Sequence, residues 1–175
     1  MNKTDDMINK HIAAVQLRME RLAIELSDRS QKHDESKLEN PEHSMWLYMD
    51  KDCLKPKYGT PEYFQKMKRF KYVFDQHYRD PRNRHHPEHW ENGIYDMNLV
   101  DIIEMLCDWI SYKSNLSYSE ASKVIEENCE RFGFDDQIRN VLLNTLREYF
   151  SSFGGEDDNN YIKVLKDRFK LKSNC

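Results

Sequence analysis

Cysteine, glycine and proline are all scarce in this chain of 175 residues. It holds 4 Cys, 5 Gly and 5 Pro, and no two of the cysteines form a CxxC pair. Without such pairs or a secretory leader, we expect neither a disulfide framework nor a structural zinc knuckle, and we predict a reduced, cytoplasmic protein. Because Gly and Pro are rare, long stretches run uninterrupted, which favours helices.

Long apolar runs and an excess of basic charge are missing as well. No segment approaches the roughly 18–20 apolar residues that cross a bilayer, and the charged opening MNKTDDMINK does not fit a secretory leader. The 27 basic and 31 acidic residues give a net charge of -4, without the positive charge that binds phosphate backbones. We therefore expect no membrane and no nucleic-acid partner, while a homo-oligomer is compatible with the sequence. The 12% aromatic content favours a folded chain.

Apolar residues recur at helical spacing along most of the chain, and no β-alternation of useful length is present. The spacing predicts one long helix from about residue 4 to 34. Residues 41–60 are expected to be irregular. Thr60 and Pro61 predict the start of a second helix that runs to residue 77 or 78. The expected core face of the first helix comprises Ile8, Val15, Met19, Leu22 and Leu26.

Three more helices are expected in the second half of the chain. They begin after Asn98, at Ser117 or Ser119, and after Asp135 or Asp136, and Gly133 ends the middle one near residue 131. Residues 79–97 predict a loop or short turns. The fold class is therefore all-α. Residues 1–152 are expected to form a single-domain helical bundle that contains a long, ordered, histidine-rich loop. Residues 153–175 are expected to form an acidic linker and a helix over 161–170.

The histidine-rich loop and one acidic helix face are the candidates for chemistry. Four of the seven histidines fall between residues 77 and 89, and ordered loops of this length tend to be functional. Asp101, Glu104 and Asp108 are spaced i, i+3, i+7, so they share one stripe of the third helix. Two interpretations stay open: a solvated acidic face, or a cation site onto which the loop and the end of the first helix converge.

Three motifs resemble those of the HD-domain phosphohydrolase superfamily. The segment 33–37, His-Asp-Glu-Ser-Lys, is similar to its His-Asp-x-x-Lys motif. The segment 85–89, His-His-Pro-Glu-His, resembles the paired-histidine loop of the members with two metals, and segment 104–109 resembles the helix with the last aspartate. The resemblance covers residues 11–150 and is greatest for a small branch with His-Asp-x-Ser-Lys and His-His-Pro-Glu-His-aromatic motifs.

The resemblance implies a helical HD-like domain that binds one or two divalent ions (Mn, Fe, Co, Zn or Mg) and hydrolyses a small phosphate ester, often a nucleotide. It implies that Asp34, Asp108 and Lys37 act in catalysis and that Lys37 approaches the substrate phosphate. Two roles stay open for Arg82 and Arg84: charge-assisted bonds to the substrate phosphate, or neutralisation of nearby acids. His89, Asp101 and Glu104 are expected to contact the metal ligands without binding the metal themselves. The implied metal ligands are His33, Asp34, His77, His85, His86 and Asp108.

The superfamily's first ligand is a histidine on an earlier helix, which by position would be His11. A single helix over residues 4–34 places His11 about 33 Å from His33, at ~1.5 Å per residue, so His11 stays outside the expected set. Two other functions remain open. One is a di-iron oxygenase with a similar His/Asp set, and the other is a non-enzymatic helical module that binds a metal or a partner.

Overall fold

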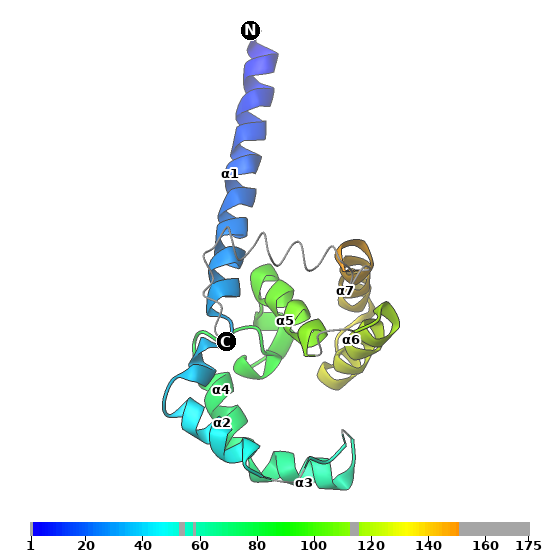
Figure 1. Cartoon of the computed structure of the whole chain (residues 1–175). Coiled ribbons are helices and arrows are strands. Elements are labelled where there is room, and N and C mark those ends of the chain that lie inside the picture. The colour runs from blue at the N-terminus through cyan, green and yellow to red at the C-terminus, as the bar shows by residue number, and fades with distance from the viewer. Residues whose placement is uncertain (1, 53–54, 58, 113–115, 151–175) are drawn as a thin grey trace. The chain divides into compact units, whose positions relative to one another are not determined.

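The computed structural model describes residues 2–52, 55–57, 59–112 and 116–150, and every regular element in these ranges is a helix (Figure 1). The predicted all-α fold is therefore confirmed. The chain divides into two compact units, residues 1–104 and 105–175. The expected boundary at residue 152, the acidic linker and the last helix lie outside the described residues. Within the described ranges, no helix is long and apolar enough to cross a bilayer.

The first unit begins with one long helix, α1 (Lys3–Lys32), as the sequence predicts. Asn2 caps it by accepting a hydrogen bond from the backbone N–H of Asp5. The expected core face is wrong for this helix, because none of its residues is buried. Helical spacing identifies an apolar stripe but not what covers it. Here the other elements of the unit gather at the C-terminal end of α1, so most of the helix has none of them against it (Figure 1).

Two corrections concern the middle of the first unit. Residues expected to be irregular contain helix α2 (Glu42–Asp50). The single helix expected over residues 60–78 is two helices, α3 (Pro61–Arg69), capped by Thr60 as predicted, and α4 (Lys71–Arg79). The break falls at Phe70, which leaves helical geometry and is fully buried. The spacing of apolar residues along the segment does not report this break.

The histidine-rich segment is a chain of short turns, as expected. It contains two 3-10 turns, η2 (Pro87–His89) and η3 (Gly93–Asp96). A third 3-10 turn, η1 (Glu35–Leu38), lies elsewhere and follows α1. Two side chains of the histidine-rich segment contact the backbone: Nε1 of Trp90 donates to the carbonyl of Arg84, and Nδ1 of His89 lies 2.7 Å from the carbonyl oxygen of Tyr78. These bonds hold the loop in one conformation.

Helix α5 (Leu99–Ser111) passes from the first unit into the second, which also holds α6 (Tyr118–Phe132) and α7 (Asp136–Tyr149). The predicted ends are largely right. Ser117 and Glu120 form a capping box, and Gly133 ends α6 in the left-handed conformation. In the core of the second unit, the ring of Trp109 stacks on that of Phe132 at 6.0 Å.

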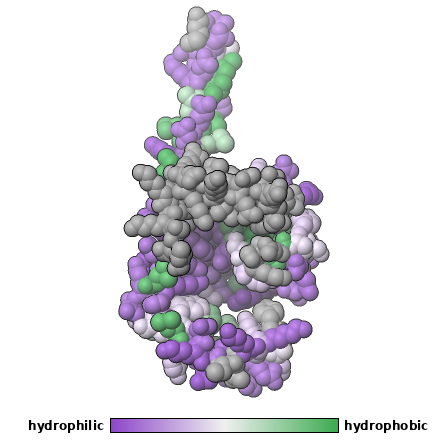
Figure 2. Space-filling model, viewed as in Figure 1, coloured by the Kyte–Doolittle hydropathy of each residue, from purple (hydrophilic) through white to green (hydrophobic). Residues whose placement is uncertain are grey.

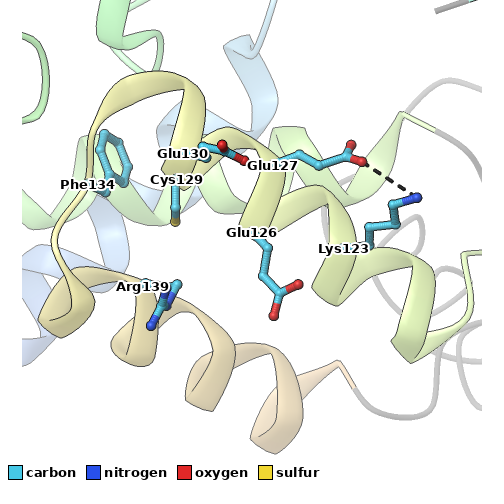
Figure 3. Close-up of a pocket in the computed structure, with 7 residues that line it drawn as sticks. All are labelled: Lys123, Glu126, Glu127, Cys129, Glu130, Phe134 and Arg139. Atoms are coloured by element: carbon cyan, nitrogen blue, oxygen red, sulfur yellow. Dashed lines mark ion pairs between the residues drawn. The ribbon is translucent and has the colours of Figure 1, made fainter. Parts of the chain in front are cut away.

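A pocket of about 510 Å³ lies between α6 and α7 in the second unit (Figure 3). Its lining is charged, with Lys123 3.7 Å from Glu127 and with Arg139 supplied by α7. The lining includes no histidine. Burial raises the pKa of the Cys129 thiol, so this cysteine is protonated at neutral pH and poorly suited to act as a nucleophile or ligand.

Candidate metal centre

Three segments of the first unit that are distant in sequence bring four side chains together. Asp34 follows the end of α1, His77 lies in the last turn of α4, and His85 and His86 stand in the loop before η2. Asp34 has φ 57° and is the only non-glycine residue with positive φ among those described. Such a conformation costs free energy for a non-glycine residue and is concentrated at functional sites.

The distances between the four groups fit a single cation. One ligand atom from each residue lies within 4.8 Å of all the others. Nε2 of His77 lies 3.3 Å from Oδ1 of Asp34 and 2.9 Å from Nε2 of His86, and Nε2 of His85 lies 3.7 Å from the same Oδ1. Atoms that each bind one ion at ~2.0–2.2 Å are separated by distances of this size.

Two glutamates lie beside the Nδ1 atoms of two of these rings, and Glu42 holds the ring of His77 by a hydrogen bond. Nδ1 of His77 lies 2.7 Å from Oε1 of Glu42, and Nδ1 of His85 lies 3.1 Å from Oε1 of Glu104. A carboxylate at Nδ1 keeps the proton there, which leaves Nε2 with a free lone pair. Nε2 of His77 and Nε2 of His85 both face Asp34, which is the direction required if all three residues bind one metal ion.

Three polar atoms of the cluster have no hydrogen-bond partner in the described part of the chain. They are Oδ1 of Asp34 and both ring nitrogens of His85, all buried. A buried polar atom without a partner costs about 1–3 kcal/mol, and such atoms are rare in folded proteins. A bound cation would satisfy Oδ1 of Asp34 and Nε2 of His85. Because the set is rich in imidazole, it suits Zn, Fe, Mn or Co better than Mg or Ca.

The carboxylates of the site are held ionised. Burial opposes ionisation of Asp34, but its contacts with His77 and Lys37 keep its pKa well below the usual value. Burial likewise opposes ionisation of Glu104, and contacts with His33 and His85 lower the pKa of Glu104 to about 2. Deprotonated oxygens are therefore present at neutral pH, as metal binding requires.

His33 stands at the edge of the cluster. Its Nδ1 lies 3.0 Å from Oε1 of Glu104, and its Nε2 lies 3.6 Å from Oδ2 of Asp34. His33, His85 and Glu104 form a second group that could hold an ion. That group would need Nδ1 of His85, whereas the first group needs Nε2. The number of ions, one or two, stays a prediction.

The cations expected to bind phosphate have partners in the structure. Lys37 contacts Oδ2 of Asp34 and lies over the ring of Trp46 at 5.2 Å. Arg82 pairs with the carboxylates of Glu39 and Asp80. Arg84 lies 3.2 Å from Asp101 and 4.4 Å above the ring of Trp90. Their role towards substrate stays a prediction.

The acidic stripe of α5 is not a solvated face. Asp101 is fully buried and accepts from Arg29 at 2.6 Å and from Arg84, and the Glu104 side chain is only 9% exposed. Asp108 lies one turn beyond Glu104, past the division between the two units, so its role as a ligand stays a prediction. His11 lies on the continuous helix α1 and is exposed, far from His33.

Sequence reasoning missed several residues that support the cluster. Glu42 lies in the stretch expected to be irregular, so no pattern pointed to it. Asn83 is buried and donates from Nδ2 to the carbonyl of His77 and to Oγ of Ser36. Arg29 donates to Asp101 and Glu104 from the last turns of α1. The one sequence signal for Arg29 is its position at helical spacing between Leu26 and His33.

The fold and the cluster together define an all-helical protein with a buried histidine–carboxylate centre in its first unit. The chain belongs to DUF5662, described as a family of unknown function, which matches residues 1–148. Neither the curated proteins nor the solved structures contain a match.

Proposed function

We propose that this protein is a metal-dependent phosphohydrolase that acts on a nucleotide or another small phosphate ester. One observation carries the proposal: Asp34, His77, His85 and His86 converge around buried ligand atoms, two of which have no hydrogen-bond partner in the described part of the chain. The resemblance of the three motifs to the HD-domain superfamily supports the reaction class. The cation supplies a Lewis acid for the phosphoryl oxygen and lowers the pKa of a water molecule.

The residues at the rim divide the remaining tasks. Lys37 and Arg84 are partly exposed, with 34% and 38% of their side chains accessible, so their remaining N–H groups can donate to phosphate oxygens. Oδ2 of Asp34 is directed towards Lys37 and orients the attacking water. In this proposal the imidazolium form of His33 acts as the acid: its Nδ1–H faces Glu104, and its Nε2–H gives the proton to the leaving oxygen.

The test combines elemental analysis of untagged protein with a screen of phosphate release over nucleotides in the presence of Mn, Co or Zn. We expect bound transition metal and turnover of at least one substrate. His77→Ala and His85→Ala should abolish both, while His11→Ala, which removes an exposed histidine from α1, should change neither. Oxygen consumption without phosphate release would indicate the oxygenase alternative. Metal-free protein with no response to added metal would contradict the proposal.

A further inference from the structure

The N-terminal part of α1 carries an exposed apolar stripe. Ile8, Ile12, Val15, Met19 and Leu22 follow one another at intervals of 4, 3, 4 and 3 residues, and each is 40–65% exposed. In Figure 2, hydrophobic side chains line one side of this part of the helix. An isolated helix gains little stability from its own backbone, so an amphipathic stripe of this length is expected to be packed against something.

The spacing of the stripe identifies the kind of surface that packs on it. Alternating steps of 4 and 3 residues average 3.5, which is the heptad period of a coiled coil. Leu26 is the next position, and Arg29 follows it but is engaged with Asp101 of the same unit. The available stripe therefore covers Ile8–Leu22, about 21 Å at ~1.5 Å per residue.

We propose that the stripe is the self-association surface of this protein and that a second copy of α1 packs on it as a two-stranded coiled coil. The positions beside the stripe are nearly neutral, so two copies approach without repulsion between like charges. These flanking residues are Asn9, Gln16 and Ala23 on one side and His11, Arg18 and Glu25 on the other.

A second copy fits the stripe better than the C-terminal residues of the same chain do. The helix that the sequence predicts over residues 161–170 would span only about 15 Å, at ~1.5 Å per residue, against about 21 Å for the stripe. That segment is basic, with four Lys or Arg and one Asp, and the flanks of the stripe hold no excess of acid for it to meet.

The two copies of α1 run antiparallel in this proposal. Because Arg29 packs against the start of α5, the folded part of the unit begins directly after the stripe. An antiparallel partner keeps the two folded parts at opposite ends of the coil, whereas a parallel partner brings them to the same place. The antiparallel register pairs Ile12 of one copy with Leu22 of the other, and Val15 with Met19.

The test measures the mass of the full chain by sedimentation or light scattering over a concentration series. We expect a dimer whose dissociation follows mass action. Ile12→Glu and Met19→Glu should each give a folded monomer, because these side chains are exposed in a single copy. The matched control is Leu17→Glu, which places the same charge at an equally exposed apolar residue off the stripe and should leave the dimer intact.

Three outcomes would overturn the proposal. They are a monomeric wild-type chain at every concentration, dissociation by Leu17→Glu as strong as by Ile12→Glu, or a dimer that tolerates both stripe variants. Oxidative cross-linking tests the orientation, with the wild-type chain as background. A mixture of Val15→Cys and Met19→Cys chains should form a disulfide-linked dimer, and Val15→Cys alone should not. Efficient linking of Val15→Cys to itself would overturn the antiparallel arrangement.

Discussion

Nδ1 of His77 and Oε1 of Glu42 lie 2.7 Å apart in the interior of the first unit, although 35 positions separate them in the chain. Glu42 also accepts from the indole Nε1 of Trp46, and its carboxyl is almost fully buried. A buried carboxylate between two donors fixes the tautomer of the histidine, and the tautomer decides which nitrogen faces Asp34. The candidate metal centre thus depends on a residue that does not belong to it.

Glu42→Gln is expected to weaken metal binding about 10–100-fold while the fold is kept, because the amide no longer fixes the proton on Nδ1 of His77. Titration of metal-free protein with Zn or Co, followed by calorimetry or by the Co absorption bands, measures the change. Glu39→Gln is the control, since Glu39 pairs with Arg82 and lies outside the cluster. Equal affinities for wild type and Glu42→Gln would show that Glu42 does not orient the ring.

Removal of the metal is expected to lower the thermal stability of the protein. Without a cation, Oδ1 of Asp34 and Nε2 of His85 are buried without partners. A ligand at 100 times its Kd stabilises the folded state by about 2.7 kcal/mol, so added metal should raise Tm. Scanning calorimetry with EDTA and then with Zn or Mn measures this shift. His85→Ala should remove the response to metal, and a response that survives this change would place the ion elsewhere.

Helix α1, the helices after residue 98 and most of their caps could be predicted from the sequence, because caps are local. Ser117, Gly133 and Asp135 act through residues within four positions of themselves. The bend at Phe70 and the exposure of the α1 stripe could not be predicted, since both depend on what packs against these residues. The periodicity of α1 is the same whether its partner is the chain's own core or another molecule.

The candidate site shows the same contrast. The motifs pointed to Asp34, His85 and His86 because the chemistry of a metal site restricts which residue types can serve. Glu42 and Asn83 act only through distances set by the tertiary fold, and neither stands in a motif. Asp101 and Glu104 were equally compatible with solvent and with a site, and only their burial decides between the two.

Two substitutions of Asp34 are expected to separate the effect of its backbone conformation on stability from the effect of its carboxylate on metal affinity. Asn adopts the left-handed region more readily than most residues, so Asp34→Asn should fold normally yet lose metal affinity with the carboxylate. Asp34→Val places a β-branched residue at positive φ and should cost at least about 1–3 kcal/mol of stability in addition. Urea unfolding of the metal-free variants, with metal titration beside it, distinguishes the two. Comparable stability of both variants would argue against strain at this position.

Arg84 and Arg82 are expected to differ in their effect on substrate. Arg84 has a half-exposed guanidinium against Trp90 beside buried Asp101, so Arg84→Gln should raise KM for a phosphate ester. Arg82 is occupied by Glu39 and Asp80, so Arg82→Gln should leave KM nearly unchanged. Steady-state kinetics on whichever substrate the screen identifies supplies both values. A larger effect from Arg82→Gln would reverse the assignment of the two arginines.

The Arg82 pairs also predict how stability depends on pH. The hydrogen bond from Arg82 lowers the pKa of the Asp80 carboxyl, and Arg82 lowers the pKa of Glu39 in the same way. A carboxyl with a lowered pKa in the folded state contributes stability above its unfolded pKa, near 4, and loses it as the pH falls through the folded value. Arg82→Gln should therefore reduce the free energy of unfolding at pH 7 more than at pH 2–3. Urea unfolding at both pH values measures the difference, and a loss that is the same at both would mean that Arg82 acts through packing and not through charge.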